Sequence, residues 1–136
     1  MDIAAIRAGL AAAVVNSISG MQTMPTVPDR IDPPTFSAGE VEIDYNQTSS
    51  VGGLTVLLCK GRLYSSRADV AAGQANLDGY LAPTGALSIK AAIEADKTLG
   101  GACRTLHVER AHGYGRYEVG GVDYYGIQLD VRVWAI

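Results

Sequence analysis

The 136-residue sequence has little of what several classes of protein require. It has two cysteines, one tryptophan and no cluster of basic residues, and its net charge is −3. No segment is apolar over the roughly 18 residues that a membrane-spanning helix needs. Nucleic-acid binding through phosphate contacts needs a concentrated basic surface, whereas the eleven Lys and Arg residues are scattered. These absences disfavour a membrane protein and a nucleic-acid-binding protein.

The two cysteines are Cys59 and Cys103, and they do not form a CxxC pair. Both lie in apolar, strand-like contexts, so the simplest interpretation is two buried free thiols in a reducing compartment. A disulfide between them is the alternative. The apolar stretch LAAAVV near the start resembles part of a signal peptide, but Asp2 precedes Arg7 and the run is short. We therefore interpret this region as an N-terminal helix of the mature chain.

No catalytic motif stands out. The segment HGYGRYEVGG (112–121) lacks the phosphate-loop pattern, and a strand follows it, which indicates hairpin glycines. His107 and His112 are five residues apart on a strand and its turn, so we expect them to point to opposite faces and to share no metal. No serine lies in a GxSxG motif. We expect no enzyme activity, no cofactor and no metal.

Hydrophobic periodicity predicts an α+β fold in one domain over residues 1–136. Residues 2–19 carry one apolar stripe of an amphipathic helix, which Asp2 caps and Gly20 ends. Four prolines follow within ten residues and exclude a helix or a central strand there. Strands are expected at 35–45, 54–64, 104–110 and 122–134, and helices from Ser65 or Ser66 to about 82 and from 86 to 96. A further strand, not assigned to residues, precedes these four.

This order predicts a mainly antiparallel or mixed sheet with two main helices and a short third helix on one face. In the last strand, apolar residues at 127, 129, 131 and 133 alternate with residues 128, 130, 132 and 134, which we expect to face solvent.

The strand at 35–45 has an acidic side. Glu40, Glu42 and Asp44 alternate with Val41 and Ile43, so the three carboxylates are predicted to lie in a row on one face. A solvated face is the simplest interpretation. Neighbouring carboxylates of this row would lie about 7 Å apart, which is poor spacing for a closed cation site. Such a row would, however, repel a polyanion.

Two further segments indicate contacts with other proteins. Tyrosine and tryptophan are enriched in protein interfaces, although aromatic pairs also stabilise hairpins. The C-terminal hairpin contains several of them, namely Tyr114, Tyr117, Tyr124, Tyr125 and Trp134. The polar loop from 46 to 53 begins with Asn46, Gln47, Thr48, Ser49 and Ser50. We expect this loop to become ordered on contact with another protein.

The whole chain resembles the tail terminator proteins of long-tailed, non-contractile (siphovirus-type) bacteriophages, in the version found in actinobacterial phages. The resemblance rests on the start MDIAAIRAGLAAAV, the proline-rich connector, the strand GEVEIDY, and the block LAPTGALSIKAAIEADKTLGGACRTLHVERAHGY. It is a resemblance of pattern and order, because none of these segments is a catalytic motif. The resemblance implies that the segment 80–101 connects a helix to a strand and is not part of a phosphate site.

The resemblance implies a ring, usually of six subunits, that caps the tail tube, stops its growth and joins it to the head connector. The implied partners are other copies of the chain, the major tail tube protein and the head connector or head-closure protein. The implied location is the tail–head junction of the virion, after assembly in the host cytoplasm and with no membrane partner. DNA would pass through the lumen without specific binding, and Glu40, Glu42 and Asp44 are the candidates for an anionic lumen wall. The partner on which the polar loop from 46 to 53 becomes ordered would be a neighbouring ring of subunits.

Three alternatives remain open. Another neck component, such as a head-closure or tail-completion protein, belongs to the same class. A small ligand-binding α+β dimer of ferredoxin-like type belongs to a different class. A small enzyme would need a site assembled from Asp44, His107, Glu109 and His112, which do not have the spacing of a known motif.

Overall fold

A computed structural model describes residues 2–18, 20–24, 34–44, 55–67 and 73–135, and the side chains of Met24 and Asp44 lie outside that description. Its fold is α+β, as predicted. The helices are α1 (Ile3–Ser17), α2 (Gly73–Tyr80) and α3 (Ile89–Glu94), and a 3₁₀ turn spans Leu99–Gly101. The strands are β1 (Gln22–Met24), β2 (Thr35–Asp44), β3 (Thr55–Arg67), β4 (Thr105–Val119) and β5 (Val122–Ala135).

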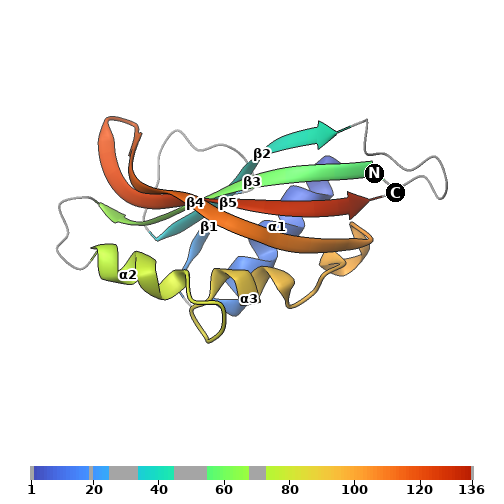
Figure 1. Ribbon diagram of the computed structural model, residues 1–136, viewed down its shortest axis with the longest axis horizontal. Helices are drawn as coiled ribbons and strands as arrows, with labels where there is room; N and C mark the ends of the chain where they lie inside the picture. The colour runs from blue at the N-terminus through green and yellow to red at the C-terminus, as the bar shows by residue number, and fades with distance from the viewer. Residues whose placement is uncertain (1, 19, 25–33, 45–54, 68–72, 136) are drawn as a thin grey trace.

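The five strands form one sheet in the order β1-β2-β3-β5-β4 (Figure 1). β1 pairs with β2 in parallel, and every other neighbouring pair is antiparallel. β1 is the additional strand that the sequence pattern did not place. It covers only Thr35–Ser37 of β2, so the sheet is mixed but mainly antiparallel, as expected.

The N-terminal helix forms for the reasons seen in the sequence. Asp2 is its N-cap, and the Asp2 carboxylate accepts a hydrogen bond from the Ala5 N–H at 3.1 Å. Ile6, Leu10 and Val14 are fully buried on one side of the helix. The helix ends at Ser17, two residues earlier than predicted.

All three helices lie on one side of the sheet (Figure 1). A single core joins helical residues such as Leu10, Leu77 and Ile93 to inward-facing strand residues such as Phe36 and Leu129. The opposite side of the sheet carries no described helix. We call it the open face.

The predicted end of the strand before α2 and the predicted start of the helix itself are both wrong. Ser65 and Ser66 do not begin a helix, because β3 continues to Arg67 and pairs there with Tyr124 and Tyr125 of β5. The strand ladder therefore overrides the tendency of serine to cap helices. Within α2, Leu77 is buried, and residues 68–72 lie outside the described residues.

The third helix is also shorter than predicted. Ser88 is its N-cap, with Oγ accepting from the Ala91 N–H at 3.1 Å, so α3 begins only at Ile89. Leu87, which lies within the predicted range 86–96, precedes the helix and is exposed. The cap fixes the helix start more strongly than the apolar pattern does.

The largest correction concerns β4, which extends to Val119 instead of ending at Arg110. Most of the segment predicted as a turn is therefore strand. The turn itself is Gly120–Gly121, and both glycines have positive φ angles, 59° and 80°. A two-residue hairpin loop with two positive φ angles strongly favours glycine. Val119 and Val122 pair directly across it.

Candidate assembly surface

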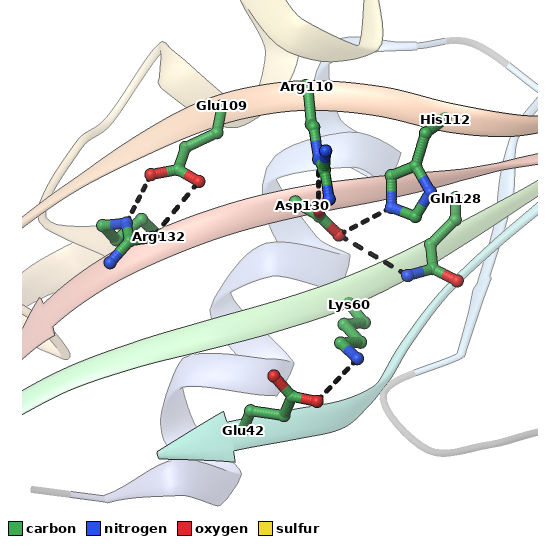
Figure 2. Close-up of polar contacts among 8 residues, drawn as sticks. All are labelled: Glu42, Lys60, Glu109, Arg110, His112, Gln128, Asp130 and Arg132. Carbon is green, nitrogen blue, oxygen red and sulfur yellow. Dashed lines mark hydrogen bonds and ion pairs between the residues drawn. The ribbon is translucent and has the colours of Figure 1, made fainter. Parts of the chain in front are cut away.

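The open face presents a network of charged side chains across four strands (Figure 2). It exists because residues 128, 130, 132 and 134 of β5 alternate with apolar residues that face the helices. The alternation was predicted, but the degree of burial was not. Asp130 was expected to face solvent, yet its side chain is only 4% exposed.

Asp130 is the centre of this network. Its Oδ2 accepts from Arg110 Nε at 2.8 Å, and its Oδ1 lies 3.1 Å from His112 Nε2 and 3.5 Å from Gln128 Nε2. Burial alone raises the pKa of the Asp130 carboxyl, but the hydrogen bonds from Arg110, His112 and Gln128 together outweigh burial and lower it. The carboxylate therefore stays charged and links β5 to the edge strand β4.

Further ion pairs flank this centre. Arg132 of β5 binds Glu109 of β4. Lys60 of β3 binds Glu42 of β2 at 2.7 Å. Pairs as exposed as these contribute little to stability, so their main effect is to set the charge pattern of the surface.

Of the predicted acidic row, Glu40 and Glu42 lie on the open face, but they are not an uncompensated anionic wall. Glu42 pairs with Lys60, and Glu40 lies 3.5 Å from Arg62 Nη2. Asp44 belongs to β2, but its side chain is outside the described part of the chain. Because the two described carboxylates have cationic partners in β3, their repulsion of a polyanion is weaker than that of a bare row.

The two histidines lie on the same face, which corrects the prediction. A register shift between Val108 and Arg110 adds one residue to β4. His112, five positions after His107, therefore points to the same face as His107. His107 contacts the Trp134 ring, with centroids 6.4 Å apart, and His112 contacts Asp130. Of the rival catalytic set, Glu109 is bound to Arg132.

The four tyrosines of the hairpin divide into three groups. Tyr117 and Tyr124 pack edge-to-face on Tyr64 in a small second core on the open face. Tyr114 instead donates to Asp78 of α2 at 2.7 Å, which fastens the hairpin to the helical side. Tyr125 also packs against the main core.

These contacts within the chain account for much of the aromatic cluster. Tyr124 is only 6% exposed, whereas Trp134 on the open face is partly accessible. A contact between these aromatics and another subunit stays a prediction. The loop residues Asn46 to Ser50 lie outside the described residues, so their predicted role is also untested.

The outer edge of β4 has one described cap. Glu94 of α3 accepts a hydrogen bond from the backbone N–H of Val108 at 3.0 Å. Burial raises the pKa of Glu94, but Lys90 and the Val108 N–H together lower it, so the cap is a carboxylate. One outward N–H of a strand edge is thereby satisfied.

A groove of about 340 Å³ lies between α1 and α3. Small residues line most of it, including Gly9, Ala13 and Ala92. Asp96, its one acidic lining residue, already accepts hydrogen bonds from Thr98 and Gly100. In the described part of the chain, no three His, Cys, Asp or Glu side chains gather as metal ligands would.

The two cysteines are both buried, and neither forms a disulfide, which agrees with the simpler interpretation of the sequence. Burial raises the pKa of the Cys59 thiol to about 12. Neither thiol has the electropositive, partly exposed surroundings of a reactive cysteine.

Comparison with known proteins adds no assignment. No model of a known protein family and no curated protein matches the chain. No helix within the described ranges has the length and apolar character needed to cross a membrane.

Proposed function

We propose that this protein is a structural component of a siphovirus-type virion, a tail terminator. In this role, copies of the chain form a ring, with six subunits as the expected number, that caps the tail tube, stops its polymerisation and joins it to the head connector. The protein acts by binding alone and catalyses no reaction.

The observation that carries the proposal is the open face. Ion pairs link β2 to β3 and β4 to β5 on a side of the sheet that no described helix covers. Such a face is polar enough to stay soluble in a free subunit and structured enough to recognise another protein. The described residues offer no comparable arrangement for catalysis, because Glu109 and His112 each bind a charged partner in β5.

The order of elements supports the same class. The described helices and strands follow one another in the order α1, β1, β2, β3, α2, α3, β4 and β5, which is the order expected from the sequence pattern on which the resemblance was stated. A ring needs a heterologous contact, in which two different surfaces of one subunit meet. The sheet supplies two unlike edges, β4 on one side and β1 with β2 on the other.

Tail length in a phage whose copy of this gene is disrupted tests the proposal. Electron microscopy should show abnormally long tails, because nothing stops the addition of tube subunits. Normal-length tails unattached to heads would instead assign the protein to head closure or tail completion. Normal, infectious particles would refute any role at this junction.

A further inference from the structure

The register of the sheet aligns two acidic side chains at one edge with an arginine and a histidine at the other. Glu40 of β2 pairs with Lys60, which pairs with Asp130, which pairs with Arg110 of β4. Glu42 is linked in the same way through Leu58 and Arg132 to His107. Glu40 is therefore level with Arg110 and Glu42 is level with His107, with two strands between each pair.

The directions of the edge strands are also compatible. β2 is antiparallel to β3, β3 to β5 and β5 to β4, so β2 and β4 run in opposite directions. A second copy placed beside the first, in the same orientation, would set its β2 antiparallel to β4. Antiparallel neighbours are the slightly more stable arrangement.

The side chains at both edges are accessible. Those of Glu42, Arg110 and His107 are 63%, 67% and 62% exposed. Among the described strands, β1 covers only the first three residues of β2 and leaves Glu40–Asp44 without a partner on the outer side. At β4, Glu94 occupies the Val108 N–H, so side chains carry the contact at that position.

The charges of the two edges differ. β2 contains three acidic residues and no basic residue, and Glu40 and Glu42 each have a cationic partner in β3. Residues 104–116 contain three arginines and two histidines against one glutamate, Glu109, which is already bound to Arg132. Glu94 of α3 is paired with Lys90 and also lies 3.9 Å from His107 Nδ1, and Glu118 lies near the hairpin end of β4.

We propose that the partner of each edge is a second copy of this chain, with Glu40 and Glu42 of one subunit facing Arg110 and His107 of the next. This deepens the proposed function and rests on it, because it names the contact that builds the ring. It gives the acidic row a role in subunit contact in place of a lumen wall. Repeated around an axis, the contact puts every open face on the same side of the assembly.

Cysteine cross-linking tests the contact. The double variant Glu42→Cys/His107→Cys is treated with a short bis-maleimide at a concentration where light scattering detects oligomers. We expect a ladder of covalent multimers on a denaturing gel. The wild type should give none, because Cys59 and Cys103 are buried.

Three controls define the geometry. Each single variant should give no product, because a head-to-tail contact brings position 42 of one subunit only to position 107 of another. The pair Asn76→Cys/His107→Cys places one thiol on α2, away from the edge, and should give no ladder. Glu42→Lys should raise the protein concentration needed for assembly about tenfold, and Glu42→Gln should raise it less.

The outcomes separate this inference from the proposed function. Oligomers without cross-links, dimers formed by a single variant, or a chain that stays monomeric at its highest soluble concentration would each overturn the edge contact. A tail-length defect in the disrupted phage would still support a terminator in those cases. Conversely, a clear ladder together with normal tails would support the contact and refute the terminator role.

Discussion

Arg110 Nε lies 2.8 Å from Asp130 Oδ2, and this pair ties the edge strand β4 to the centre of the open face. The two partners differ in exposure: the arginine side chain is 67% accessible, whereas the aspartate side chain is 4% accessible. The pair therefore combines a buried, structural carboxylate with a cation that remains available to another molecule. The Asp130 carboxylate should therefore govern the stability of the fold, and the Arg110 cation should govern the assembly of subunits.

Asp130→Ala should destabilise the fold by about 1–3 kcal/mol, because Arg110, His112 and Gln128 lose a shared acceptor. Chemical denaturation monitored by circular dichroism measures the loss. Asp123→Ala is the matched control, since Asp123 is exposed on the same strand and should change stability by less than about 0.5 kcal/mol. Equal losses in the two variants would contradict a central role for Asp130.

The stability of the fold should also depend on pH through this carboxyl. The pKa of Asp130 is lower in the folded than in the unfolded chain, so its contribution is present above the unfolded pKa, near 3.9. That contribution is lost as the pH falls through the folded pKa. Asp130→Asn should therefore show a shallower loss of stability below about pH 4 than the wild type. Denaturation midpoints recorded between neutral and acid pH provide the comparison, and parallel curves would count against the prediction.

Gly126→Ala should destabilise the hairpin. A Cβ at position 126 would lie 2.8 Å from the Leu63 carbonyl oxygen and 2.9 Å from the Tyr117 ring. Crowding of this kind costs about 1–3 kcal/mol. Gly115, its cross-strand partner, has no heavy atom within 4 Å of the equivalent Cβ, so Gly115→Ala is the control. The melting temperature should fall for the first variant and stay nearly unchanged for the second.

Cys59 should not react with thiol reagents in the native protein. Its pKa is raised to about 12 by burial, so very little thiolate exists at pH 8, and the side chain is 1% exposed. A colorimetric thiol assay should detect two thiols in the denatured protein. In the native protein it should detect none during the first minutes of reaction. Rapid labelling of Cys59 in the folded protein would show that β3 opens readily.

The sequence predicted the regular parts of this fold well. α1 follows from the spacing of Ile6, Leu10 and Val14 and from its cap at Asp2, which are local features. β5 follows from its alternation of apolar and polar residues. Both elements have one face in the core, and such patterns can be read without knowing the partner element.

The errors arose where long-range pairing decides the structure. Ser65 and Ser66 favour a helix cap locally, but pairing with β5 keeps them in a strand. The glycines of β4 look like turn residues, although the ladder to β5 extends across them. The burial of Asp130 was missed for the same reason. Its partners Arg110 and His112 lie on another strand, and a register shift that the sequence pattern does not reveal aligns them.

The most direct test of the account is a cryo-electron microscopy reconstruction of the junction between tail and head in particles that carry this protein. We predict a ring of copies of this chain at the head-proximal end of the tail tube, with β2 of each subunit beside β4 of the next. Particles that lack the chain, or a density at the junction that this fold does not fit, would contradict the assignment.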